Sequence, residues 1–410
     1  MAFRNFLRST AAVALVCSAG ASFAEPLKIA LVETLSGPQA STGLFYRNGV
    51  IYGIGKINAE GGFGGEPVEL LEYDNQGGPV GAADRVRAAI SDGANIIIQG
   101  SSSAVAGQIT EDVRKYNLRN RGNEVVYINV GGAAMELTGA KCHDYHFRMT
   151  PNAEIIVNAL LEGMKEDGAL GENVYAINQN YSWGVDVQNS TLAAADSLGF
   201  EVVEQTLHEV NKIQDFSPYV ARIKESGADT VITGNWSNDL LLLMKAAGGA
   251  GLDVRFGTAF LDQPGNIGNA GAIADGHFVA TSFNPEVNPE KSTAFVEDYK
   301  SVIGHYPTYV EPQGIFGMML LKEALKSVEP TEDGLAADDL VAALEQATVE
   351  TPMGTMTMRA DDHQGRLPMV VQKVSRDAVY KADESEFGFV PVKVLSAEEA
   401  EQPVQDSCKM

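Results

Sequence analysis

The sequence predicts an α/β protein of two lobes, each built on a mostly parallel β-sheet that helices cover on both faces. Short, continuously apolar segments alternate with segments of helical periodicity from residue 27 onward. Strands that are apolar on both faces are typical of parallel sheets. Successive strands are separated by roughly 30 residues, the length of a parallel strand–helix–strand crossover. The alternation occurs twice along 410 residues, and a chain of this length usually folds as more than one domain.

Apolar spacing and turn residues define the first series of elements. Pro79 begins one of its helices and Gly93 follows the end of that helix, as is common at helix termini. The expected strands are 27–32, 68–73, 95–98 and 125–130, and the expected helices are 45–57, 79–90 and 104–116. This order predicts a first lobe that begins with a strand and then alternates.

The second series begins after residues 147–151, which we interpret as the first crossing between the lobes. Its expected strands are 173–177, 201–206, 230–233 and 276–281, and its expected helices are 152–164, 185–198, 218–224 and 239–247. Two helices, 293–303 and 314–328, and two short strands, 354–359 and 368–374, complete the expected elements. We therefore expect the following division: residues 25–148 and 282–351 in lobe 1, residues 149–281 and 352–395 in lobe 2, and a C-terminal tail of residues 396–410.

The N-terminus has the three parts of a cleavable export signal. Arg4 and Arg8 form a basic start, an apolar run covers 11–16, and a small-x-small triplet ends at Ala24. The apolar run is far shorter than the roughly 20 residues that a membrane-spanning helix needs. We expect a signal peptide of residues 1–24, cleavage after Ala24 and a periplasmic mature protein. An ordinary N-terminal helix and a lipid-anchored cysteine are the alternatives.

The charge and the cysteine content limit the partners. The formal net charge is −24, from 54 acidic and 30 basic residues, whereas nucleic-acid binding depends on Lys and Arg side chains that neutralise phosphates. We therefore expect no nucleic-acid partner. Two cysteines, Cys142 and Cys408, remain after removal of the signal. An even count in an exported chain favours one disulfide, and two free thiols are the alternative.

Catalytic and metal sites have little support in the sequence. The stretch 142–146 holds one cysteine and two histidines, but no second cluster completes the four ligands of a zinc site. No GxSxG nucleophile motif is present. We expect no metal, no cofactor and no enzymatic activity. A catalytic triad assembled from distant residues is the alternative.

The segment 100–103 is the best local candidate for ligand binding. Its sequence is Gly-Ser-Ser-Ser, and it lies between an expected strand and an expected helix. Backbone N–H groups and hydroxyls at such a helix N-terminus are suited to a small anion such as a carboxylate. A plain helix N-cap would have the same sequence, so that interpretation stays open.

Short segments in a fixed order carry a resemblance to a known family. They are 29–32 leading into 35–38, then 57–62, 73–76, 215–219 and 227–230. With them, the chain resembles the type I periplasmic solute-binding proteins of ABC transporters, specifically the branched-chain amino-acid, or leucine-binding-protein-like, receptors. The resemblance covers nearly the whole mature chain. It implies two Rossmann-like lobes joined by three crossover segments, with the ligand between them at the carboxyl ends of the strands. It also implies hinge closure around the ligand.

The resemblance implies ligand contacts from both lobes. The first lobe is expected to supply Thr42, Ser101, Ser102, Gly132 and Ala133, and the second lobe Tyr181, Trp183, Trp236, Phe260 and Asp262. Trp183 stands in a polar loop, which favours a binding wall, although tryptophan is more often a core residue. Two positions depart from the family pattern. Ala133 stands where members place a hydroxyl. The family's acid near Ala259 or Phe260 is missing, and Asp262 and Asp239 are the alternative substitutes.

The sequence therefore predicts the periplasmic binding component of an ABC importer, acting on a small amino acid or organic acid. The expected partners are that ligand and a membrane permease, and the expected oligomeric state is a monomer. The residues leave three alternatives open: a receptor for aromatic carboxylates, a sensory binding protein on the same fold, and an exported enzyme. Tyr181, Trp183, Trp236 and Phe260 would sandwich an aromatic ring in the first alternative.

Overall fold

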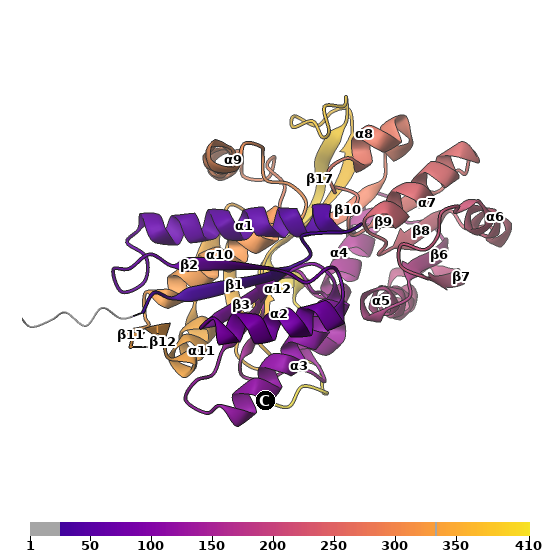
Figure 1. Ribbon diagram of the computed structural model, residues 1–410. Coiled ribbons are helices and arrows are strands. Elements are labelled where there is room, and N and C mark those ends of the chain that lie inside the picture. The colour runs from indigo at the N-terminus through magenta and orange to yellow at the C-terminus, as the bar shows by residue number, and fades with distance from the viewer. Residues whose placement is uncertain (1–24, 333) are drawn as a thin grey trace, which may run out of the picture.

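The computed structural model describes residues 25–332 and 334–410 (Figure 1). The predicted signal peptide, residues 1–24, lies outside the described residues. None of the described helices combines the length and the apolar character needed to span a membrane.

The first lobe contains an eight-stranded sheet. Its strands are Lys28–Glu33 (β1), Glu69–Asp74 (β2), Ile96–Gln99 (β3), Val126–Asn129 (β4), His146–Arg148 (β5), Thr348–Thr351 (β13), Gly354–Arg359 (β14) and Gln364–Arg366 (β15). The spatial order is β13-β14-β15-β5-β4-β3-β1-β2. All pairings from β15 to β2 are parallel, and β13, β14 and β15 pair antiparallel at one edge. Every residue of β3 and β4 is buried, and each strand is apolar except at its last residue, Gln99 or Asn129.

Helices of the first lobe surround this sheet. They are Ala40–Ala59 (α1), Pro79–Ser91 (α2), Ser103–Arg119 (α3), Pro289–Ile303 (α9), Glu311–Leu325 (α10) and Ala337–Gln346 (α11), with a 3-10 turn at Met135–Thr138 (η1). A short hairpin, Pro330–Thr331 (β11) with Gly334–Leu335 (β12), precedes α11.

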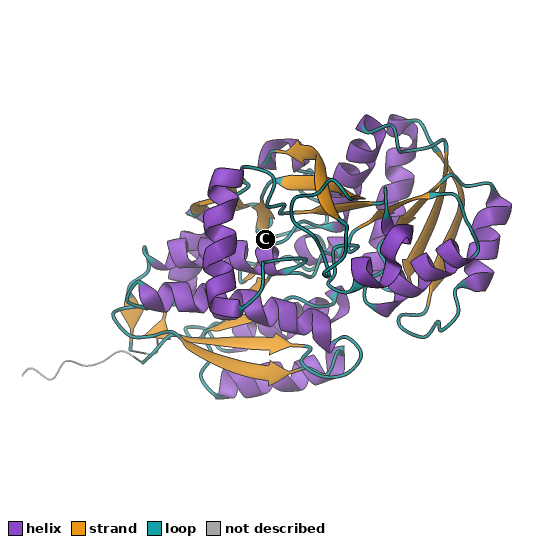
Figure 2. Ribbon diagram, turned by 90° about the horizontal axis from the view of Figure 1, so that it is seen from above, coloured by secondary structure: helices purple, strands orange, loops and turns teal. Residues whose placement is uncertain are grey.

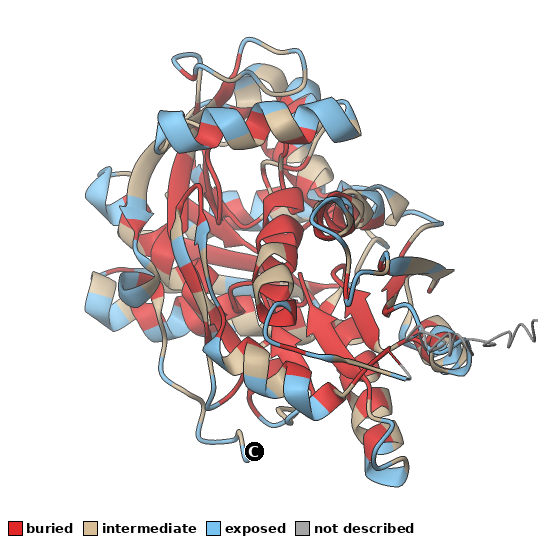
Figure 3. Cartoon of the chain, turned by 90° about the vertical axis from the view of Figure 1, so that its left-hand side faces the viewer, coloured by how far each residue is buried: buried red, intermediate tan, exposed pale blue. Residues whose placement is uncertain are grey.

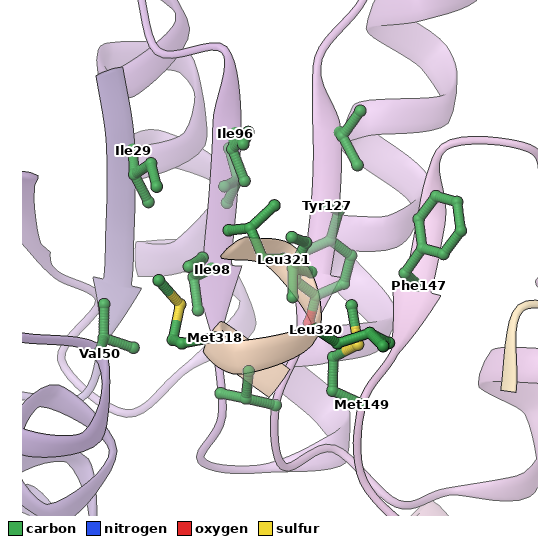
Figure 4. Packing of buried hydrophobic residues seen from close by; sticks show 14 of the residues in the cluster. Ile29, Val50, Ile96, Ile98, Tyr127, Phe147, Met149, Met318, Leu320 and Leu321 are labelled. Carbon is green, nitrogen blue, oxygen red and sulfur yellow. The ribbon is translucent and has the colours of Figure 1, made fainter. Parts of the chain in front are cut away.

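Helix α10 lies between the first sheet and α1, and it is buried along most of its length. Figure 4 shows its Leu321 beside Ile98 of β3 and its Leu320 beside Met149. A glycine in α1 allows the close approach, because a Cβ at Gly53 would lie 2.3 Å from the Cβ of Met318 in α10. Burial of each large aliphatic side chain here stabilises the lobe by about 1.5–3 kcal/mol.

The second lobe contains a seven-stranded sheet. Its strands are Asn173–Gln179 (β6), Glu201–His208 (β7), Thr230–Thr233 (β8), Arg255–Thr258 (β9), Phe278–Thr281 (β10), Met369–Ser375 (β16) and Gly388–Leu395 (β17). The order is β17-β16-β10-β9-β8-β6-β7, and only the pairings of β16 with β10 and β17 are antiparallel. Its helices are Ala153–Glu166 (α4), Ser182–Leu198 (α5), Ser217–Ser226 (α6), Asn238–Gly249 (α7) and Asn266–Ala270 (α8), with a 3-10 turn at Gly271–Ala274 (η2) and a last short helix at Ala397–Ala400 (α12).

The two sheets lie side by side as separate layers, each with helices around it (Figure 2). Figure 3 shows buried residues along the strands and on the inward sides of the helices, with exposed residues on the outer faces. The α/β fold class and the two lobes predicted from the sequence are confirmed. The chain passes between the sheets after β5, after β10 and after β15, so three crossover segments join the lobes.

The third crossing differs from the sequence expectation. Residues from 352 onward were expected in the second lobe, but β14 and β15 belong to the first sheet. The physical reason is that β15 pairs with β5, with Gln364 opposite Arg148. The side chains of these two residues also interact, because the Arg148 Nε–H donates to Gln364 Oε1 at 2.7 Å. The return to the second lobe therefore follows Arg366 rather than Thr351.

The C-terminal tail leads from the second lobe back to the first. After α12, Glu401 forms salt bridges with Arg359 at 3.0 Å and with Arg366 at 2.5 Å. Both arginines belong to the first lobe. The Gln405 Nε2–H donates to the Met135 carbonyl at 2.6 Å. Cys408 then forms a disulfide with Cys142, as the sequence predicted. The tail is thus a further link across the lobes, in addition to the three crossovers.

Candidate functional site

One cavity lies where the strands of both sheets reach their carboxyl ends, the edge at which open α/β sheets bind ligands. The turns that follow β3, β4, β6, β8 and β9 meet at this cavity, together with α1 and the loop before α10. The empty space in this cavity, counted together with the solvent at its mouth, is about 320 Å³. The lining residues are Thr42, Tyr46, Gly100, Ser101, Ser102, Ser103, Gly131, Ala133, Tyr181, Trp183, Trp236, Phe260 and Tyr309.

Eight of the ten ligand contacts expected from the sequence line this cavity. The first lobe supplies Thr42, Ser101, Ser102 and Ala133, and the second lobe supplies Tyr181, Trp183, Trp236 and Phe260. These residues meet because each group follows a strand whose carboxyl end points to the same gap between the lobes.

Gly132 is not among the lining residues. Its N–H donates to Asn129 Oδ1 at 2.6 Å, and its carbonyl accepts from Asn129 Nδ2 at 2.8 Å. A Cβ at Gly132 would lie only 2.6 Å from the Cβ of Ala106 in α3. The glycine therefore shapes the turn after β4, where no larger residue fits.

Asp262 also lies outside the lining, two residues beyond Phe260. It is partly buried, and burial raises its pKa to about 7. Burial first, and then nearby charges that include Asp262, raise the pKa of both Tyr46 and Tyr309. The Asp262 carboxyl is therefore close enough to the lining phenols to influence the potential in the cavity.

Tyr46 and Tyr309 line the cavity but were missed in the sequence. The Tyr46 ring packs on the turns after β3 and β4, because a Cβ at Gly100 would lie 2.3 Å from its Cδ1 and a Cβ at Gly131 would lie 2.1 Å from its Oη. Tyr309 meets Phe260 edge to face, with ring centroids 5.8 Å apart. The available signal for Tyr46 was a glycine one or two residues beyond the end of each strand, since such glycines mark a close approach of another group.

A buried carboxylate organises the Gly-Ser-Ser-Ser turn. Glu33, at the end of β1, is fully buried and accepts from the N–H groups of Gly100 at 2.8 Å and Ser101 at 3.1 Å. It also accepts from the Ser101 hydroxyl and from the Thr34 N–H. Burial raises the pKa of Glu33, while these four hydrogen bonds favour its charged form. The N–H groups that the sequence offered to a ligand anion at Gly100 and Ser101 are thus occupied by Glu33.

Other polar groups of the turn region remain directed to the cavity. Ser102 has a φ of +70°, and Ser103 Oγ accepts from the N–H groups of Ala133 and Ala134 at 3.1 Å each, which joins the turns after β3 and β4. Thr42 Oγ1 is buried without a hydrogen-bond partner of standard geometry, although it interacts with the Tyr309 phenol. A buried hydroxyl without a full partner is a candidate to bind a ligand.

Both tryptophans present ring surface rather than N–H groups. The Trp183 Nε1–H donates to the Gly234 carbonyl at 2.8 Å, and the Trp236 Nε1–H donates to Tyr181 Oη at 2.8 Å. Trp183 is only 2% exposed and also belongs to the core of the second lobe. It is therefore both a core residue and a wall of the cavity.

Comparison with known proteins identifies the family. The model of the periplasmic binding protein family matches residues 26–379 of this chain, which is most of its length. The chain belongs to the periplasmic binding protein family.

Relatives and solved structures are similar to this chain over nearly its full length. The chain is 65% identical to a protein named Leu/Ile/Val-binding protein homolog 4 from Brucella abortus (strain 2308), covering 100% of this chain and 99% of that protein. It is 67% identical, with a TM-score of 0.91, to the crystal structure of a leucine-, isoleucine-, valine-, threonine- and alanine-binding protein from Brucella ovis in a closed conformation, covering 94% of this chain and 99% of that one. A benzoate complex of a solute-binding protein from R. palustris is 20% identical, with a TM-score of 0.77 over 93% of this chain and 98% of that one, and shares the fold.

Direct contacts join the two lobes of this periplasmic binding protein beside the cavity. The Met135 N–H of η1 donates to Asp186 Oδ2 of α5 at 2.7 Å. The ring contact of Phe260 with Tyr309 also crosses from one lobe to the other. The Arg148 Nη1–H donates to the Ala134 carbonyl at 2.5 Å and thereby fixes the segment that carries Met135. The lobes are thus in contact around the cavity, as a hinge-closing receptor requires when it encloses a ligand.

Proposed function

We propose that this chain binds a small amino acid in the cavity between its lobes and delivers it to the membrane permease of an ABC importer. The observation that carries the proposal is the meeting of eight expected contacts, four from each lobe, around one cavity. The names of the Brucella relatives, which refer to leucine, isoleucine and valine, support an amino acid as the ligand.

The cavity has groups for both ends of such a ligand. The hydroxyl of Thr42 and the backbone of Ser102 and Ser103 are suited to the carboxylate. The carboxyl of Asp262, two residues beyond the lining residue Phe260, would serve as the counter-charge for the ammonium, which is costly to bury without one. The apolar side chain would lie against the aromatic walls.

The chain is an exported periplasmic protein, and we propose that its signal is cleaved after Ala24. We propose that it acts as a monomer, binds no nucleic acid and releases its ligand chemically unchanged. We further propose lobe boundaries that follow the sheets, with residues 25–148 and 282–366 in the first lobe and residues 149–281 and 367–395 in the second.

Calorimetric titration of the mature chain with leucine, isoleucine, valine, threonine and alanine tests the proposal. We expect saturable binding of one ligand per chain, and chromatography should recover the ligand unchanged. A ligand at 100 times its Kd should raise the free energy of unfolding by about 2.7 kcal/mol. Product formation over repeated turnovers, or failure of every amino acid to bind, would refute the proposal.

A matched pair of variants locates the site. Thr42→Val removes the cavity hydroxyl at nearly constant shape and should weaken binding at least tenfold, because a ligand carboxylate loses a buried donor. Thr110→Val is the control, since Thr110 in α3 is also buried with an unpartnered hydroxyl but does not line the cavity. Equal effects of the two changes would place the ligand elsewhere.

A further inference from the structure

We infer that the cavity binds a small zwitterion whose positively charged nitrogen carries methyl groups, that is, the betaine of an amino acid, and that aromatic ring faces hold this nitrogen. The inference rests on the proposed function and specifies its ligand class. Four observations support it: the ring geometry, the use of the indole N–H groups, the charge around the cavity and the shortage of free acceptors.

Aromatic side chains form most of the cavity wall. They are Tyr46, Tyr181, Trp183, Trp236, Phe260 and Tyr309. Neighbouring rings meet at steep angles: Trp183 and Phe260 are inclined by 50° with centroids 5.5 Å apart, and Phe260 and Tyr309 by 77° at 5.8 Å. Rings inclined in this way present faces in more than one direction, which suits a compact group that contacts several rings at once. A methylated ammonium is such a compact group and is attracted to the faces of aromatic rings.

The N–H groups of both indoles are already hydrogen-bonded within the protein. The N–H groups of Trp183 and Trp236 donate to Gly234 and Tyr181, so neither N–H is free for a ligand, and both residues line the cavity. Tryptophan is the strongest of the aromatic side chains in attracting a cation to its face.

The charges around the cavity favour a cation. Among the described residues that line it, none is Lys, Arg or His. The nearby ionisable acids are Glu33, which bonds to the lining residue Ser101, and Asp262, which acts on the lining phenols of Tyr46 and Tyr309. The lining thus contains no positive side chain that would repel a cation, and a buried carboxyl group lies behind it at Glu33.

Hydrogen-bond acceptors in the wall are largely engaged. A primary ammonium has three donors that need partners when buried. Ser103 Oγ accepts two backbone N–H groups, and Tyr181 Oη accepts from Trp236. A trimethylated nitrogen has no N–H donor and needs no acceptor, so it fits this wall without an unsatisfied group.

Three ligands of matched size test the inference by calorimetric titration of the mature chain. Glycine betaine carries the methylated cation, glycine is its parent, and 3,3-dimethylbutyrate has the shape of glycine betaine with carbon in place of the charged nitrogen. We expect glycine betaine to bind at least tenfold more tightly than either comparison ligand. The pair of valine and N,N,N-trimethylvaline should show the same preference for the methylated member.

A ring-to-aliphatic variant tests the mechanism. Phe260→Leu keeps an apolar side chain but removes a ring face. It should weaken the binding of glycine betaine at least fivefold and change the affinity for 3,3-dimethylbutyrate less than twofold. Phe295→Leu is the matched control, because Phe295 in α9 is also half-buried but does not line the cavity.

The outcomes separate this inference from the proposed function. Binding of valine or glycine with no gain from methylation would overturn the inference and leave the proposed function standing. Equal affinities for glycine betaine and 3,3-dimethylbutyrate would also overturn it, because the charge would then contribute nothing. Failure of every amino acid and every betaine to bind would overturn both.

Discussion

Replacing Cys142 and Cys408 together by serine removes the disulfide without leaving an unpaired thiol. The two cysteines are 266 positions apart, so the bond closes a very long loop in the unfolded chain. The loop-entropy relation gives about 5.6 kcal/mol for a loop of this length as an upper limit. In the folded protein the tail is also held by Glu401 and Gln405, so the native structure should persist without the bond. We expect the free energy of unfolding to fall by about 3–5 kcal/mol, mainly through the unfolded state.

Urea unfolding followed by circular dichroism measures this change. The dependence of the unfolding free energy on urea should become steeper in the double variant, because a chain without the cross-link is more expanded when unfolded. The wild-type protein under a thiol reductant should match the double variant, and Ser407→Ala, next to Cys408, should have little effect. A loss below about 1 kcal/mol with an unchanged urea dependence would refute the reasoning that the bond restricts the unfolded chain.

Three further predictions concern the cavity. Burial raises the pKa of Asp262 to about 7, so the folded protein binds a proton at this carboxyl more tightly than the unfolded chain. The free energy of unfolding of the unliganded protein should therefore fall as the pH rises from about 4 to 7. Urea unfolding of Asp262→Asn should show no such fall. Trp183→Ala should lower the free energy of unfolding by about 3–5 kcal/mol, because the indole is a core residue, and an unchanged urea midpoint would contradict this. Gly131→Ala should weaken ligand binding at least tenfold by displacing the Tyr46 ring, whereas Gly55→Ala, with open space around its Cβ position, should leave the measured Kd unchanged.

Much of the site could be predicted because its residues directly follow apolar strands. The turns at Ser101, Ala133, Tyr181, Trp236 and Phe260 each come after a strand, and parallel topology places all such turns at the same edge of a sheet. The local pattern of strand and turn therefore carries information about position in space. The disulfide was also predictable, because export leaves only two cysteines to pair.

The residues that were missed are brought to the site by packing alone. Tyr46 lies within a helix and Tyr309 in a loop before a helix, so neither follows a strand, and only the approach of α1 to the turns after β3 and β4 places the Tyr46 ring in the cavity. Glu33 ends a strand in the same way as many buried residues, and nothing in its neighbours shows that its carboxylate will take the N–H groups of Gly100 and Ser101.

The sequence by itself predicted the alternation of strands and helices, the two lobes, and the turns that line the cavity. These features follow from local composition and from apolar periodicity, which depend only on residues close together in the sequence. Only the tertiary structure decided that β14 and β15 belong to the first sheet, that the tail returns to the first lobe, and that the rings meet at steep angles. Strand partners and ring orientations depend on contacts between distant segments, and local sequence does not specify such contacts.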